Sequence, residues 1–414
     1  MFFKKHLKSV PITLLTGYLG AGKTTLLNNI LRNPAGHKIA VIVNDIGEVN
    51  IDAELIAKGG AIEKPDENLV PLQNGCICCT LKTDLMEQIV SLITKGKFDY
   101  IVIEASGICE PIPIAQTITA MTEMAKTGQI PVACHLDNIA SVVDALRIAK
   151  EFNCGEGFEE FAASEEDEHH HHDHDHDHDE HEEHHHEEHH DHDDDDDEED
   201  EDIASLLVQQ IEFCNTIILN KVDEVSEGEK KQIRTIIKAL APDVKIIETN
   251  FCNVDINELI DTNSFDIEEV YSSAGWIKAL THDHHHKDPT ALEYGINTFV
   301  YTSRKPFVKE KLDDAFKLLH KKVIRTKGFI WFDAEPSYMY IFEQCGPQVT
   351  IQQNGMWAAA LPEDQKKEVF ANYPDVLENW DEKYGDRLNR VVFIGQGIDE
   401  EKISKMMDEC LGDI

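Results

Sequence analysis

The sequence predicts an α/β protein with a mostly parallel sheet flanked by helices, followed by a smaller α+β domain. Its 414 residues are enough for two domains that each bury a core. In the first half, short runs rich in Val, Ile and Leu alternate with segments whose apolar residues recur at helical spacing. Nearly continuous apolar runs are typical of strands that are covered on both faces, which favours a parallel sheet.

The expected elements follow in chain order. In the first half we expect strands at 12–16, 39–43, 100–103, 141–143 and 216–219, and helices at 24–31, 85–93, 203–211 and 231–240. In the second half we expect strands at 295–301, 329–332, 338–342 and 391–394, and helices at 309–320 and 400–410. We therefore assign 1–275 to the first domain, 276–292 to a polar linker and 293–414 to the α+β domain.

An acidic histidine run dominates the charge of the chain. Every residue from Glu165 to Asp202 is Asp, Glu or His, with 24 acids and 14 histidines in 38 positions. Setting those 24 acids aside reduces the net charge from −41 to −17. Neither value suits a nucleic acid or an anionic membrane surface, because both require clustered Lys and Arg. We find no apolar run that resembles a signal peptide or is long enough to span a membrane. The ten cysteines do not form a disulfide-scaffold pattern, so we expect a cytoplasmic protein.

The histidines of this run are potential metal ligands. Like charges repel and nothing apolar is present to bury, so we expect a solvated loop without a stable element, inserted in the first domain. An unperturbed imidazole, with a pKa of about 6.5, is mostly neutral at pH 7 and can bind several Zn²⁺, Ni²⁺ or Co²⁺ ions weakly. A merely solubilising loop would explain the acids but not the histidines. For a second cluster, His282 and His284–His286, metal binding and a plain polar linker stay equally open.

A glycine-rich loop follows the first expected strand. Residues 17–24 read Gly-Tyr-Leu-Gly-Ala-Gly-Lys-Thr and fit G-x-x-x-x-G-K-[ST] between a strand and a helix. Such a loop surrounds phosphates with backbone N–H groups, while its Lys contacts the β- and γ-phosphates and its Thr binds Mg²⁺. We therefore predict a P-loop NTPase. The expected nucleotide-binding residues of this loop are Gly17, Gly20, Ala21, Gly22, Lys23, Thr24 and Thr25.

Two further segments predict the rest of the nucleotide site. Asn220-Lys221-Val222-Asp223 directly follows a strand, where an Asp carboxylate accepts hydrogen bonds from guanine that adenine cannot donate, so GTP is favoured. Glu104 and Gly107 follow the strand at 100–103, where NTPases place a carboxylate for Mg²⁺ and a glycine that contacts the γ-phosphate. We assign Lys23, Thr24 and Glu104 to catalysis, and Thr24 and Glu104 to Mg²⁺. A polar strand-end loop remains the plainer alternative for both segments.

A cysteine cluster predicts a transition-metal site. Cys76, Cys78 and Cys79 fall within four positions of a polar turn, which packing explains poorly. Thiolates bind zinc in tetrahedral sites, so two or three of them need a ligand from elsewhere. Asp45, Glu48 or a histidine are the candidates, and we include Glu48 in the predicted set. Because the cluster lies between the presumed switch loop at 44–48 and Glu104, we expect nucleotide state to change metal affinity.

Taken together, these segments resemble the CobW family of P-loop GTPases. The matching segments are 17–24, 43–48, 75–79, 104–107 with Pro111, 220–223, and in the second half 302–307 and 325–329. The resemblance implies slow GTP hydrolysis, a nucleotide-dependent homodimer, and delivery of a metal to a client metalloprotein or a metal-cofactor pathway enzyme. The family usually has Glu where Asp45 stands here.

Three functions fit the sequence. The leading hypothesis is a GTPase metallochaperone that uses GTP, Mg²⁺ and Zn²⁺, with Co²⁺ or Ni²⁺ as other metals. The alternative is a zinc storage or buffering protein based on the histidine run. A third, an ATP-dependent kinase or transferase, conflicts with Asn220–Asp223.

Overall fold

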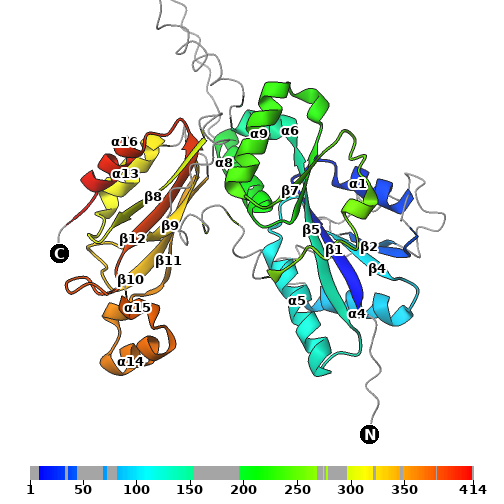
Figure 1. Ribbon diagram of the computed structural model, residues 1–414, viewed down its shortest axis with the longest axis horizontal. Coiled ribbons are helices and arrows are strands. Elements are labelled where there is room, and N and C mark those ends of the chain that lie inside the picture. The colour runs from blue at the N-terminus through cyan, green and yellow to red at the C-terminus, as the bar shows by residue number, and fades with distance from the viewer. Residues whose placement is uncertain are drawn as a thin grey trace, which may run out of the picture.

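The computed structural model describes residues 9–32, 36–43, 69–71, 82–152, 154, 195–267, 274, 277, 296–319, 323–345, 348–378 and 380–412. Two sheets organise these residues, one in each half of the chain (Figure 1). No helix in the described ranges combines the length and the apolar character that a membrane crossing requires.

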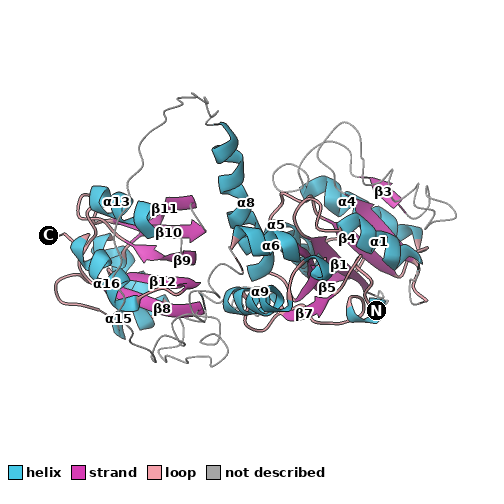
Figure 2. Ribbon diagram, turned by 90° about the horizontal axis from the view of Figure 1, so that it is seen from above, coloured by secondary structure: helices cyan, strands magenta, loops and turns pink. Residues whose placement is uncertain are grey.

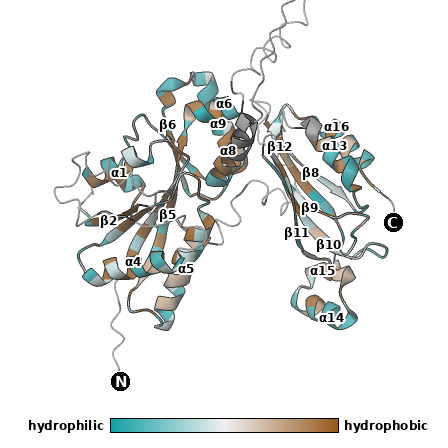
Figure 3. Cartoon of the chain, turned by 180° about the vertical axis from the view of Figure 1, so that it is seen from behind, coloured by the Kyte–Doolittle hydropathy of each residue, from teal (hydrophilic) through white to brown (hydrophobic). Residues whose placement is uncertain are grey.

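The first sheet has seven strands in the order β3-β2-β4-β1-β5-β6-β7, and every neighbouring pair is parallel. Its strands are β1 (Val10–Thr16), β2 (Ile39–Val43), β3 (Leu69–Pro71), β4 (Tyr100–Glu104), β5 (Cys134–Asp144), β6 (Thr216–Asn220) and β7 (Lys245–Glu248). The predicted parallel α/β fold is therefore confirmed. Hydropathy colouring shows hydrophobic residues along these strands, as expected for strands buried on both faces (Figure 3).

Helices cover both faces of this sheet. One face packs against α1 (Lys23–Arg32) and the segment 252–260, which includes the short helix η2 (Ile256–Glu258). The other face packs against helices α4, α5, α6, α8 and α9. Their bounds are α4 (Lys82–Lys95), α5 (Ile112–Thr127), α6 (Ala145–Glu151), α8 (Asp195–Glu212) and α9 (Glu227–Leu240), and the 3₁₀ turn η1 (Val222–Glu224) precedes α9. This three-layer arrangement places the loops after the strands at one edge of the sheet.

The second sheet is antiparallel and has five strands in the order β11-β10-β9-β12-β8. Its strands are β8 (Ile296–Ser303), β9 (Val323–Ile330), β10 (Tyr338–Cys345), β11 (Gln348–Met356) and β12 (Asn389–Gln396). Its helices are α13 (Lys309–Leu319), η3 (Ala358–Ala360), α14 (Glu363–Asn372), α15 (Asp375–Glu378) and α16 (Glu400–Glu409). A separate apolar cluster, rich in Phe, packs one face of this sheet against α13 and α16, which confirms the predicted α+β unit.

Two element predictions are wrong. The strand expected at 329–332 runs instead from Val323 to Ile330, because Arg325 and Lys327 made its first half appear too polar for a strand. The acidic histidine run was expected to form no element, yet α8 begins inside it, at Asp195. Carboxylates in the first turns of a helix interact favourably with the partial positive charge at its N-terminus.

Helix α8 lies between the two sheets (Figure 2) and contacts β10 and β11 of the second. Glu212 at its C-terminal end is completely buried and accepts hydrogen bonds from Arg325 of β9, with Nε–Oε1 at 3.0 Å and Nη2–Oε2 at 3.2 Å. Arg325 Nη1 also lies 2.7 Å from Cys345 Sγ. A buried, bidentate ion pair therefore joins the two sheets.

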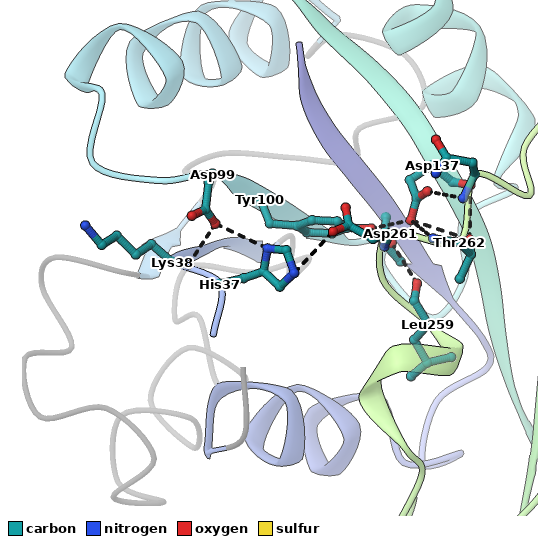
Figure 4. A network of polar contacts seen from close by, with 10 residues as sticks. His37, Lys38, Asp99, Tyr100, Asp137, Leu259, Asp261 and Thr262 are labelled. Carbon is teal, nitrogen blue, oxygen red and sulfur yellow. Dashed lines mark hydrogen bonds and ion pairs between the residues drawn. The ribbon is translucent and has the colours of Figure 1, made fainter. Parts of the chain in front are cut away.

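A buried polar network lies toward the amino-terminal ends of β4 and β5 in the first sheet (Figure 4). A bulge in β5 carries Asp137, whose carboxylate accepts hydrogen bonds from Tyr100 Oη at 2.5 Å and from the backbone N–H of Thr262 at 3.1 Å. His37 bridges Asp99 and Asp261 at 3.5 and 3.2 Å. Burial and the bond to Asp137 raise the pKa of Tyr100. The network ties the segment 261–264 to β4 and β5.

The Tyr100→Phe variant should lose about 1–3 kcal/mol of stability, because the buried Asp137 carboxylate loses one of its donors. Urea unfolding measures the change. Tyr340→Phe is the matched control, since its hydroxyl bonds the exposed Glu335 and its loss should cost little. Equal costs for both variants would show that the network does not contribute as proposed.

Candidate nucleotide site

The predicted phosphate-binding and base-binding residues meet at one edge of the first sheet. The strands β4, β1, β5 and β6 are neighbours and parallel, so their carboxyl ends lie side by side. The P-loop follows β1, Glu104 ends β4, and Asn220 ends β6. In open parallel sheets, ligands bind in the crevice outside these ends.

The glycines of the P-loop are required by close packing. Gly17, Gly20 and Gly22 have φ angles of 132°, 74° and 117°, a region that other residues rarely adopt. A Cβ on Gly17 would lie 2.2 Å from the Val142 carbonyl oxygen, and one on Gly22 would lie 2.6 Å from Asn220 Nδ2. Only glycine fits at these two positions, so the loop can curl tightly enough for its N–H groups to surround a phosphate.

The proposed catalytic residues surround this loop. Lys23 is buried, and its Nζ donates to the Tyr18 carbonyl at 3.2 Å, so the ammonium stays at the loop. Thr24, in the first turn of α1, is half-buried, whereas the adjacent Thr25 is exposed. Glu104, only 1% exposed, pairs in register with Leu15 of β1. A hydroxyl and a carboxylate are hard oxygen donors of the kind Mg²⁺ prefers, so this pair fits the ion.

Gly107 contacts both the P-loop and α8. A Cβ on Gly107 would lie 2.6 Å from Leu19 Cδ2, so this loop and the P-loop touch. The Gly107 carbonyl accepts a hydrogen bond from Gln210 Nε2 at 3.0 Å. Gln210 is 1% exposed and lies on the same helix as Glu212. This contact is not predictable from the sequence, since nothing in Gln210 itself distinguishes it from other helix residues.

The base motif is anchored to the P-loop by its first residue. Asn220 Nδ2 donates to the Ala21 carbonyl at 2.8 Å, and Asn220 Oδ1 accepts the backbone N–H of Cys252 at 3.0 Å. Asp223 is exposed, and its backbone N–H donates to Asn250 Oδ1 at 3.1 Å. The exposed carboxylate is thus available to a base.

Lys221 combines an unusual backbone conformation with an ion pair to Asp144, which was not among the predicted site residues. Its φ is 60°, and its Nζ lies 2.5 Å from Oδ2 of Asp144 at the end of β5. Asp144 also caps α6 by accepting the N–H of Arg147 at 3.2 Å. An Asp at a strand end that precedes a helix is a recognisable capping signal, so the sequence did contain a clue.

Unlike Thr24 and Glu104, which were assigned to Mg²⁺, the predicted transition-metal ligands lie outside the described residues. These are Glu48 and Asp45, the motif Cys76, Cys78 and Cys79, and the histidines of both clusters. The seven cysteines that the structure describes are all buried. Across the described ranges, no group of three or more His, Cys, Asp or Glu residues is arranged to hold a metal ion.

Comparisons with known proteins identify the family. Residues 11–248 match the CobW/HypB/UreG nucleotide-binding domain, and residues 296–411 match the cobalamin synthesis protein cobW C-terminal domain. A zinc-regulated GTPase metalloprotein activator 1 from Dictyostelium discoideum is 34% identical, over 98% of this chain and 80% of its own length. The zinc chaperone YjiA of Escherichia coli is 28% identical, over 79% of this chain and 84% of its own length. The first match alone spans more than half of the residues, and the chain therefore belongs to the CobW/HypB/UreG family, with a CobW C-terminal domain.

Proposed function

We propose that this protein is a GTP-hydrolysing metallochaperone that binds zinc at the Cys76-Ile-Cys-Cys79 motif and transfers it to a client metalloprotein under nucleotide control. The chain is a P-loop GTPase of the CobW family, and relatives named zinc chaperone and zinc-regulated GTPase metalloprotein activator support zinc as the cargo. The single observation that carries the proposal is the meeting of the P-loop, Glu104 and Asn220 at one sheet edge in a chain that also has the cysteine motif.

The described residues divide the nucleotide chemistry among them. We assign Lys23 to the charge of the β- and γ-phosphates and Asp223 to the guanine edge. Thr24 and Glu104 would hold Mg²⁺, which on binding supplies charge neutralisation at the phosphates. We assign Gly107, whose loop touches Leu19, to contact with the γ-phosphate. The resemblance to the CobW family implies slow hydrolysis.

Metal transfer would follow from coupling between zinc binding and nucleotide binding. If zinc binds the three thiolates more tightly in one nucleotide state, hydrolysis converts that difference into release. A homodimer, a cytoplasmic location and a client metalloprotein are parts of this proposal. The histidine run favours a second candidate, zinc storage, because 14 imidazoles add capacity without selectivity.

A zinc competition titration on a chain lacking residues 165–194 tests the proposal. The deletion stops before Asp195, where α8 begins, so that the helix joining the two sheets stays intact. We expect one tight site whose affinity differs by about tenfold between GDP and a non-hydrolysable GTP analogue. Cys78→Ser should abolish the tight site.

Cys410→Ser is the matched control, because Cys410 is buried in the second half of the chain and its thiol bonds the Lys311 and Met406 carbonyls. It should leave zinc binding unchanged. A tight site that ignores the nucleotide, or no tight site after the deletion, would instead favour storage by the histidine run.

A further inference from the structure

An aromatic side chain stands exposed beside the base motif. Phe251, in the loop that follows β7, is 77% exposed, although burying a phenyl ring removes a large apolar area from water. It is the most exposed of the large hydrophobic side chains among the residues the structure describes. An apolar ring at this position needs a reason, because a polar residue would be better solvated.

Its backbone conformation is as unusual as its exposure. Phe251 and Cys252 have φ angles of 55° and 51°, in the left-handed region that favours glycine and asparagine. Asn29 of α1 holds both residues there, since its Nδ2 donates to their carbonyls at 3.1 and 2.9 Å. The bulky ring is therefore kept in a conformation that its residue type disfavours.

The loop is fastened to the nucleotide site on its inner side. Cys252 is completely buried, its N–H donates to Asn220 Oδ1 at 3.0 Å, and its Sγ lies 3.4 Å from the Gly22 carbonyl. Asn250 accepts the N–H of Asp223 at 3.1 Å. Cys252 is turned toward the P-loop, while the adjacent Phe251 is turned to solvent. Phe251 therefore lies between two residues, Asn250 and Cys252, that both contact the base motif.

We propose that Phe251 covers a face of the guanine base and thereby sets the affinity of the site for nucleotides. Asp223 can recognise only the hydrogen-bonding edge of the base, so contact with the flat faces of the purine has to come from other residues. A phenyl ring supplies such a contact, and base–aromatic stacking changes affinity without reading the base edge. On this proposal, the Phe251 ring is exposed because it is the surface to which the base binds. This inference requires only that the site binds guanine nucleotides.

Calorimetric titration with GDP and with a non-hydrolysable GTP analogue tests the assignment. Phe251→Ala should raise both Kd values by about tenfold and by the same factor, because the base is common to the two ligands. The KM for GTP should rise while kcat stays unchanged. The affinity for inosine diphosphate should fall by the same factor, since stacking does not distinguish purine edges. Tyr373→Ala, which removes an aromatic side chain that is 64% exposed elsewhere, should change none of these values.

Two further variants separate binding from folding. Phe251→Gly suits the left-handed backbone, so the nucleotide-free protein should melt no lower than the wild type while its GDP affinity falls about tenfold. Phe251→Trp should keep the affinity, and its fluorescence should change on GDP addition. Wild-type affinity for GDP in Phe251→Gly, or unaltered fluorescence in Phe251→Trp when GDP binds, would overturn the proposal. Absence of GDP binding by the wild type would refute the nucleotide assignment itself.

Discussion

Replacing Arg325 with alanine is expected to destabilise the protein by about 3–5 kcal/mol, the cost of leaving a buried charge without its partner. Glu212 has no exposed surface, and Arg325 is only 1% exposed. Burial lowers the pKa of the Arg325 guanidinium, but Glu212, Cys345 and Glu343 together outweigh burial and hold that pKa above its usual range. Urea unfolding followed by tryptophan fluorescence measures the loss, since three of the four tryptophans, Trp331, Trp357 and Trp380, lie in the second half.

Two variants control this experiment. Arg234→Ala removes a partner of Glu248 at the surface, where an ion pair contributes at most about 1 kcal/mol. The double variant Glu212→Leu with Arg325→Met replaces both charges by apolar groups and should recover most of the stability that Arg325→Ala loses. If Arg325→Ala cost no more than Arg234→Ala, the pair would not hold the two sheets together.

The Lys23→Ala variant is expected to reduce the kcat for GTP hydrolysis by at least about a hundredfold, the typical effect of removing one positioned donor to developing charge. The buried ammonium of Lys23 is already oriented by the Tyr18 carbonyl, so its removal takes away a positioned positive charge. Phosphate release at saturating GTP, with Mg²⁺ present, measures the rate.

Lys126→Ala serves as the control for charge, because Lys126 forms an exposed ion pair with Glu123 on α5. Its hydrolysis rate should equal that of the wild type. A Lys23→Ala variant that keeps more than half of the wild-type rate would show that phosphate charge is neutralised elsewhere.

The meeting of the proposed nucleotide-site residues at one sheet edge was predictable because their motifs are local in sequence. The P-loop glycines and Asn220–Asp223 each follow an apolar strand, and the parallel order of β1 and β6 around β5 brings them together. Strand bounds such as Ile39–Val43 matched because both faces of those strands are apolar.

Other features depend on contacts between distant residues, which sequence patterns do not contain. Arg325 made β9 appear too polar, since its burial depends on Glu212, far away in the chain. The loop around Cys252 shows no motif, and its link to Asn220 follows only from the fold. The edge strand β11 was missed because Gln352, Gln353 and Asn354 give it a polar sequence.

Because seven cysteines are buried, we expect thiol-reactive reagents to modify them only slowly in the folded protein. Burial raises the pKa of the Cys134 thiol to about 11 and that of the Cys154 thiol to about 12, so neither forms much reactive thiolate near neutral pH. The sequence has ten cysteines, and the three beyond these seven are Cys76, Cys78 and Cys79. The folded protein can be alkylated briefly, with and without added zinc, and the modified thiols identified by mass spectrometry. Any rapidly modified thiol that zinc protects can then be assigned to that motif.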